Sequence, residues 1–381
     1  MKFLTKRNFF FWFALTMGIL GLLVLYSGSS WIALQKKESS FYFVKSQFLK
    51  GFLPGVFFLI FFSKISLNFL KKVSFIFYVF SLGLIILTFI PQFQYKWAGA
   101  TRWVKIGGVV FQPTEIAKLS LILCLGAFLE RKIKKREIKK FKEGFLSFLF
   151  LVSPLLFLCF LQPDMGSLLV LASISFSMFF LGGGNILHIL LAFFLLGAVG
   201  IVSLILHPYQ MERVLSFWGL IKKPLEEDYQ IRQALIGIGS GGILGKGYLQ
   251  GLQKYFYLPQ PMGDTIFAIF GEEFGFWGTM CFLFLWFLFL FKAKDIFLKT
   301  KDTFEKLVIG GIVSFFLFQS FFHIMGNLKV LPFSGLTLPF FSYGGTSLIV
   351  VFSAMGILTN ISKRVGSNSL RSYRFTTFSG Y

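Results

Sequence analysis

The sequence predicts an all-α polytopic membrane protein, because its composition is strongly apolar, its apolar residues form long runs and its basic residues lie between those runs. Of 381 residues, 55% are hydrophobic and 14% are charged, with a mean hydropathy of +0.74. Soluble domains average about 25% charged residues. The formal net charge of +22 therefore does not indicate nucleic-acid binding. We predict no nucleic-acid partner and a single integral membrane domain over residues 1–381.

Ten apolar runs approach the roughly 20 residues that a helix needs to cross a bilayer. They lie at 9–29, 48–63, 73–91, 113–129, 145–161, 166–183, 186–207, 265–291, 305–326 and 339–361. The second and fifth runs are short, so the predicted count lies between eight and ten. The first run resembles a signal peptide, since Lys2, Lys6 and Arg7 precede it, but no small-residue cleavage site follows. We interpret it as a retained membrane anchor.

Basic residues set the predicted orientation, because Lys and Arg concentrate in cytoplasmic loops. They are more frequent in the segments that we assign to the inside: 1–8, 64–72, 130–144, 182–185, 292–306 and 362–381. They are sparser in the longer segments assigned to the outside: 30–50, 92–112, 162–165, 208–263 and 327–338. Both termini are thus predicted to be cytoplasmic. The run "ERKIKKREIKKFKE" at 130–143 either anchors this orientation or binds acidic lipid or a partner.

Residues 208–263 are predicted to form a long extracytoplasmic loop between the seventh and eighth helices, and loops of this length are commonly functional. The loop contains the glycine-rich piece "GIGSGGILGKG" at 237–247. Its glycines match a dinucleotide fingerprint and its Gly245-Lys246 pair approaches a P-loop. No strand precedes the piece, and Gly247 stands where a P-loop has Ser or Thr. We interpret it as a flexible or tightly turning segment.

The three cysteines, Cys124, Cys159 and Cys281, all lie in apolar runs. They are predicted to be small buried hydrophobic residues. Neither a disulfide framework nor a metal site follows from their spacing.

Charged residues beside the apolar runs are the first candidates for a functional site. In "QPTEIAK" (112–118), Glu115 and Lys118 are three residues apart, so they share a helix face and can pair. Charges at membrane depth face the protein interior or a wet cavity and often mark function. The pair is either structural or functional. Asp164, between two runs, either caps the following helix or belongs to the site.

The stretch "LPQPMGDTIFAIFGEEFG" (258–275) holds three acidic residues in an otherwise apolar region. Counting back roughly 20 residues from Lys292 brings the outer hydrocarbon boundary to Glu272. Asp264 then lies roughly 12 Å further out along a continuous helix, at the depth of lipid head groups. On such a helix Glu272 lies nearer to the face of Asp264 than Glu273 does. Spacing alone leaves Asp264 as either a helix N-cap or a catalytic carboxylate.

The last apolar run opens with "LPFSGLTLPFFSYGGTSL" (331–348). Pro339 interrupts helix, and Gly344 and Gly345 permit a sharp turn or a close backbone approach. A polar break of this kind at membrane depth needs protein or water to satisfy its backbone. We predict that this segment, including Ser342, lines a cavity.

Four ordered blocks of sequence resemble the SEDS family of FtsW, RodA and SpoVE proteins. They are "GATRWVKIGGVVFQPTEIAK" (99–118), "LQPDMGS" (161–167), "LPQPMGDTIFAIFGEEFGFWG" (258–278) and "GLTLPFFSYGGTSL" (335–348). The last block leans toward the FtsW branch. The resemblance implies a multi-pass protein of the bacterial cytoplasmic membrane that polymerises lipid II into glycan strands at the outer face, during division or elongation.

The resemblance also implies roles for residues. The family's catalytic carboxylate falls on Asp264, and further family positions fall on Arg102, Glu115, Lys118, Asp164 and Arg213. This chain departs from the family at Met262-Gly263, where His-Thr is common, and at His323 and Lys329.

The implied inverting reaction needs one base for the attacking sugar hydroxyl, which Asp264 can supply. The departing diphosphate needs positive charge, which the predicted topology offers on the same side at Arg102, Lys105, Arg213 and Lys246. The remaining candidates are predicted to shape the cavity: Gln112, Glu115, Lys118, Asp164, Glu272, Ser342, Gly344 and Gly345. A divalent cation, Mg²⁺ or Mn²⁺, is the one cofactor left open, although no ligand cluster of suitable spacing is present.

The partners implied by the resemblance are lipid II, a class B penicillin-binding protein acting as a monofunctional transpeptidase, other division or elongation membrane proteins, and membrane lipids. Two alternatives stay open. The chain could flip lipid-linked precursors, which Glu115, Lys118 and the broken last run would suit. It could also be a non-catalytic scaffold that recruits division proteins through its basic cytoplasmic segments.

Overall fold

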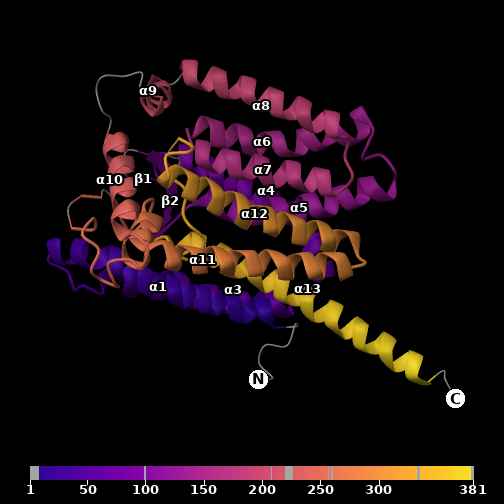
Figure 1. The fold of residues 1–381 in the computed structure, drawn as a ribbon. Helices are drawn as coiled ribbons and strands as arrows, with labels where there is room; N and C mark the ends of the chain where they lie inside the picture. The colour runs from indigo at the N-terminus through magenta and orange to yellow at the C-terminus, as the bar shows by residue number, and fades with distance from the viewer. Residues whose placement is uncertain are drawn as a thin grey trace.

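The computed structural model describes residues 8–378 except 98–99, 207, 219–225, 256, 259–260 and 333–334. The basic residues at positions 2, 6 and 7 lie outside this range. Most of the chain forms a bundle of long helices, with a small sheet and two shorter helices at one end (Figure 1).

Ten helical segments overlap the ten predicted runs. They are α1 (Phe9–Gln35), α2 with η2 and α3 (Tyr42–Lys64), α4 (Leu67–Ile86), α5 (Pro113–Lys134), η4 with α6 (Phe141–Leu161), α7 (Met165–Leu181), α8 (Ile186–Leu206), α11 (Ile266–Lys299), α12 (Thr303–Asn327) and α13 (Gly345–Phe378). Within the described residues, eight of these are long and apolar enough to cross a membrane. The other two are α7, with 17 residues, and α5, which carries charges near both ends. The polytopic helical architecture is confirmed, and the count of ten spans stays a prediction.

Several predicted boundaries are wrong. The second segment begins at Tyr42, because the short helix α2 precedes the π-helical turn at Phe48–Phe52. The fifth segment begins at Phe141, because a π-helical turn precedes α6. The third segment begins at Leu67 and not at 73. The last helix begins at Gly345 and not at 339. The residues before it, 335–344, are not helical, as the position of Pro339 explains.

A small antiparallel sheet, which an all-α prediction does not include, follows α4. It consists of β1 (Gln94–Trp97), β2 (Ala100–Ile106) and β3 (Val109–Phe111), in the order β1-β2-β3. Gly107 and Gly108, both with positive φ, form the two-residue turn between β2 and β3. The long loop likewise contains two helices, α9 (Pro208–Phe217) and α10 (Glu226–Gly241).

The most buried helices lie in the middle of the bundle. In their most apolar stretches, 83% of the α13 residues and 72% of the α12 residues are buried, against 12% in α8. Helix α13 packs against α3 and α1, and α12 packs against α5 and α7. Helix α8 lies at the edge (Figure 1). Polar side chains on α5, α12 and the start of α13 therefore face protein and not lipid.

The two ends of the bundle differ. Figure 1 shows that α1 begins and α13 ends at one end, where the connection between α5 and α6 also lies. The opposite end carries the sheet, α9 and α10. The described start of α1 and the described end of α13 therefore lie at the same end of the bundle.

The cysteines only partly follow their prediction. Cys124 and Cys159 are buried, whereas Cys281 on α11 is exposed. The expectation for Cys281 is wrong because this position faces away from the bundle, and a membrane-embedded helix can be apolar on its outer face as well.

Helix α11 is not continuous. Gly275 has φ 63° and ψ −161°, a conformation that is essentially restricted to glycine. The turn at 242–247 fills this break: Phe276 N donates to Gly242 O (2.9 Å) and Lys246 N donates to Glu272 O (3.0 Å). The glycine-rich piece is thus a tight turn from 242 onward, while its first residues end α10.

We expect Gly275→Ala to lower stability by about 1–3 kcal/mol from backbone strain alone. The added Cβ would also lie 2.2 Å from Gly245 N, so the docked turn must shift. The change is measured as a lower unfolding temperature in detergent. Gly239→Ala is the matched control, since a Cβ there meets nothing within 4 Å. Equal unfolding temperatures for the two variants would contradict the assigned role of Gly275.

Candidate active site

Asp264 lies two residues before the first residue of α11, Ile266, and is half-buried. Thr265 is the N-cap position of α11, so Asp264 stands one residue before the cap. The main-chain oxygen of Asp264 accepts a hydrogen bond from Asn327 Nδ2 on α12 (2.9 Å). The backbone of Gly335 lies beside the carboxylate, because a Cβ at Gly335 would be 3.7 Å from Asp264 Oδ2. Two segments distant in the sequence therefore meet at Asp264.

The non-helical segment 335–344 is held by side chains of α12. Gln319 Nε2 donates to both the carbonyl oxygen and the hydroxyl of Thr337 (2.9 Å each). His323 Nδ1 lies 2.7 Å from Leu336 O. The predicted polar break is thus satisfied by protein groups, as irregular backbone at membrane depth requires.

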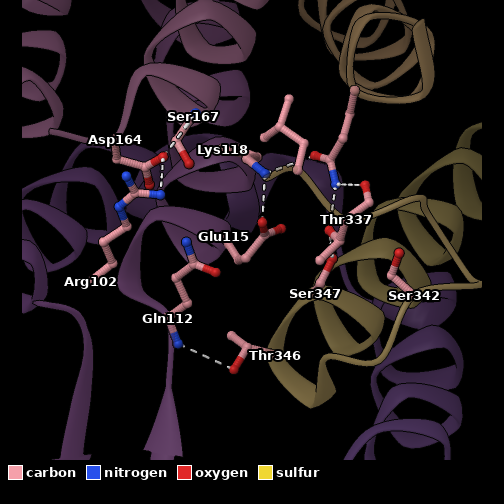
Figure 2. A network of polar contacts seen from close by, with 12 residues as sticks. Arg102, Gln112, Glu115, Lys118, Asp164, Ser167, Thr337, Ser342, Thr346 and Ser347 are labelled. Carbon is pink, nitrogen blue, oxygen red and sulfur yellow. Dashed lines mark hydrogen bonds and ion pairs between the residues drawn. The ribbon is translucent and has the colours of Figure 1, made fainter. Parts of the chain in front are cut away.

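Glu115 and Lys118 form the predicted ion pair, with Lys118 Nζ 2.7 Å from Glu115 Oε1. The side chains are 4% and 0% exposed. Lys118 Nζ also donates to Gln319 Oε1 (2.7 Å) and lies 5.5 Å from the centre of the Phe315 ring. Figure 2 shows that Glu115 and Lys118, near the start of α5, lie beside the segment that carries Thr337. The pair therefore links α5 to α12 inside the protein.

Asp164 is both a helix cap and an ion-pair partner. Its Oδ1 accepts from Ser167 N (3.2 Å) at the start of α7, which confirms the cap. The same oxygen lies 3.5 Å from Arg102 Nη1. Figure 2 shows Asp164 between Arg102 and Ser167. Arg102, on β2, also donates through Nη2 to Pro163 O (2.5 Å). The sheet is thereby fixed to the start of α7.

The start of α13 contacts both α5 and α2. The backbone N–H of Gln112 donates to Thr346 Oγ1 (3.4 Å), and Gly344 N donates to Gln47 Oε1 (3.1 Å). A Cβ at Gly345 would lie 2.9 Å from Lys50 O. The predicted close backbone approach is therefore present at Gly345.

Glu272 and Glu273 hold the loop that precedes α11. Glu272 Oε1 binds Lys246 Nζ (2.7 Å) and Leu252 N (2.8 Å), and its Oε2 accepts from Gln253 N (3.1 Å). The orientation expected for Glu272 assumed one continuous helix from Asp264 to Lys292. That assumption is wrong, because α11 begins at Ile266 and breaks at Gly275.

The same loop is tied to α1. Glu273 Oε1 lies 2.6 Å from Lys254 Nζ, and both also contact Ser27 Oγ. Tyr248 donates its hydroxyl to Leu23 O (2.8 Å). Burial raises the pKa of Tyr248, so the phenol stays protonated as a donor. These contacts explain the two glutamates as structural groups.

The four basic residues predicted to bind a diphosphate differ in their surroundings. Lys105 is exposed on β2, Arg102 is paired with Asp164, and Lys246 is paired with Glu272. The side chain of Arg213, on α9, lies outside the described residues. Their role toward substrate stays a prediction.

Sequence reasoning missed the polar face of α12. Gln319, His323 and Asn327 follow one another at intervals of four residues and so share one face of the helix. All three are buried. Polar residues at this spacing in an otherwise apolar run are the signal that could have identified them.

The long apolar helices define a multi-pass membrane protein. They enclose a buried polar network and the half-buried carboxylate of Asp264, which form a polar site near the end of the bundle that carries the sheet. The chain belongs to the cell cycle protein family of FtsW, RodA and SpoVE, whose model matches residues 7–366. This confirms the family resemblance and places the protein in the bacterial inner membrane.

Relatives cover nearly the whole chain. The stage V sporulation protein E of Bacillus subtilis is 34% identical over 345 residues, which are 90% of this chain and 93% of the relative. A protein named "Probable peptidoglycan glycosyltransferase FtsW" from Wigglesworthia glossinidia brevipalpis is 35% identical over 372 residues, 95% of each chain. The second relative agrees with the lean toward FtsW.

Solved structures share the fold. A chain from a peptidoglycan synthase complex that coordinates polymerization and crosslinking superposes with a TM-score of 0.75 and 26% identity, covering 93% of this chain and 97% of the other. The rod shape determining protein RodA of Thermus thermophilus gives a TM-score of 0.68 and 24% identity, covering 96% and 98%.

Proposed function

We propose that this chain is a peptidoglycan glycosyltransferase that polymerises lipid II at the outer face of the membrane, with Asp264 as its catalytic base. The observation that carries the assignment of the base is the half-buried Asp264 carboxylate between the start of α11 and Gly335. The names of the relatives support the activity.

The reaction needs one proton acceptor. The acceptor sugar's hydroxyl gives its proton to the Asp264 carboxylate as its oxygen bonds to the anomeric carbon of the donor. The bond from that carbon to the diphosphate oxygen breaks, and its electron pair leaves with the lipid diphosphate. Arg102 and Lys105, both on β2, are the described basic residues that we assign to the leaving diphosphate.

A divalent cation, Mg²⁺ or Mn²⁺, stays the proposed cofactor, and it would supply positive charge to the departing diphosphate. Among the described residues, no group of three His, Cys, Asp or Glu side chains is arranged to hold a metal ion.

The orientation that we propose puts both termini in the cytoplasm and the sheet, α9 and α10 outside. A monofunctional transpeptidase, a class B penicillin-binding protein, is the proposed partner. The support is the structural likeness to a chain of a peptidoglycan synthase complex in which polymerization and crosslinking are coordinated. Other division or elongation proteins, and acidic lipids at the basic run 130–143, are further proposed partners.

Flipping of lipid-linked precursors is the second candidate function, because the charged side chains of Glu115 and Lys118 lie buried beside a non-helical segment.

The candidate functions are distinguished in liposomes that contain the purified chain and fluorescent lipid II. The assay is run with and without a candidate transpeptidase. We expect glycan chains, resolved on gels. Transfer of lipid II between leaflets without polymer would favour the flippase. Partner binding with neither activity would favour the scaffold.

A further inference from the structure

Three successive carbonyl oxygens at the start of α11 are each bound by a donor from elsewhere in the chain. Met262 O accepts from Tyr343 N (2.8 Å) and Gly263 O accepts from Ser342 Oγ (2.8 Å). Asp264 O accepts from Asn327 Nδ2 (2.9 Å). Residues 262–264 belong to neither helix nor strand, so these three hydrogen bonds hold a segment that lies outside regular structure.

The donors come from rigid surroundings. Asn327 is fully buried at the end of α12, and its Nδ2 also donates to His323 O (2.9 Å) on the same helix. This second bond fixes the plane of the amide, so that its other N–H points at Asp264 O. Ser342 Oγ in turn accepts from Leu338 N (2.8 Å). Both side chains are therefore held in place before they reach the Asp264 segment.

We propose that Asn327, together with Ser342, is a positioning residue that fixes the Asp264 backbone and thereby aims the carboxylate. The inference rests on the proposed function, in which Asp264 is the base. Met262-Gly263 gives this chain a glycine directly before Asp264, and glycine allows more backbone conformations than other residues. Donors to the flanking carbonyls restrict that freedom, which matters because a misplacement of about 1 Å can cost about 100-fold in rate.

The chain contains a matched control in Asn360 on α13. Its Nδ2 likewise donates to two carbonyl oxygens, Phe62 O (2.9 Å) and Ile65 O (2.7 Å), and its side chain is also buried. Asn327→Ala and Asn360→Ala thus each remove an amide that donates to two carbonyls, and only the first affects the Asp264 segment.

The test is glycan-chain formation from purified lipid II by the full-length chain with its transpeptidase, recorded as kcat and KM beside unfolding temperature. We expect both variants to lower the unfolding temperature. Only Asn327→Ala should lower kcat, by roughly 10- to 100-fold, with KM little changed. Equal kcat values for the two variants would overturn the positioning role.

A second variant, Ser342→Ala, tests the proposal if Asn327→Ala does not fold. The Ser342→Ala substitution removes the hydroxyl that donates to Gly263 O and changes the side-chain volume little. We expect it to lower kcat selectively, and full turnover by this variant would overturn the proposal. Wild-type protein that forms no glycan would instead refute the proposed function, so the two failures are distinguishable.

Discussion

Asp264→Asn is expected to lower the rate of glycan-chain formation from purified lipid II by roughly 100- to 10,000-fold. The amide has nearly the size of the carboxylate but cannot accept the proton of the attacking hydroxyl. The main-chain bond from Asn327 to position 264 does not involve the side chain, so the backbone stays held. Polymer length and yield in reconstituted liposomes are the measurements.

The matched control for this substitution is Asp295→Asn. Asp295 lies on the same helix and pairs with the exposed Lys299 (2.5 Å), far along the chain from the site. We expect it to polymerise at the wild-type rate. Both variants should keep the wild-type unfolding temperature and co-purify with the partner. Wild-type polymerisation by Asp264→Asn would remove the assigned base.

Local features of the fold could be predicted because they depend on neighbours in the sequence. Apolar runs gave the helices, the spacing of Glu115 and Lys118 gave their pairing, and the position of Asp164 gave the cap of α7. The ion pair and the cap each join groups three residues apart, whose relation within or at the start of a helix is fixed.

The features of the fold and of the candidate site that could not be predicted depend on contacts between segments distant in the sequence. Gln319 and Lys118 are 201 residues apart, and Asn327 and Asp264 are 63 apart. No periodicity indicates which of several polar residues in separate helices will meet. The break at Gly275 is of the same kind, since a turn from the preceding loop stabilises it. The predicted position of Glu272 assumed a continuous helix from Asp264 to Lys292, and α11 is not continuous over that range.

The buried pair of Glu115 and Lys118 provides the second large effect. Lys118→Met is expected to lower the free energy of unfolding by about 3–5 kcal/mol, because it leaves Glu115 as an unpaired buried charge. Lys134→Met, in the same helix, is the control. Lys134 is 68% exposed and pairs with Glu130, which keeps Lys71 as a second partner. Little change in the unfolding free energy is expected there, because a solvent-exposed ion pair contributes little to stability.

The double variant Glu115→Gln/Lys118→Met separates a structural pair from a functional one. Removing both charges leaves no buried unpaired ion, so the unfolding free energy should recover most of the loss. Lys118 Nζ is already bonded to Glu115 and Gln319 and is fully buried, which favours a structural role. We therefore expect the double variant to polymerise lipid II. A stable double variant that forms no glycan would instead show that the two charges take part in the reaction or in substrate passage.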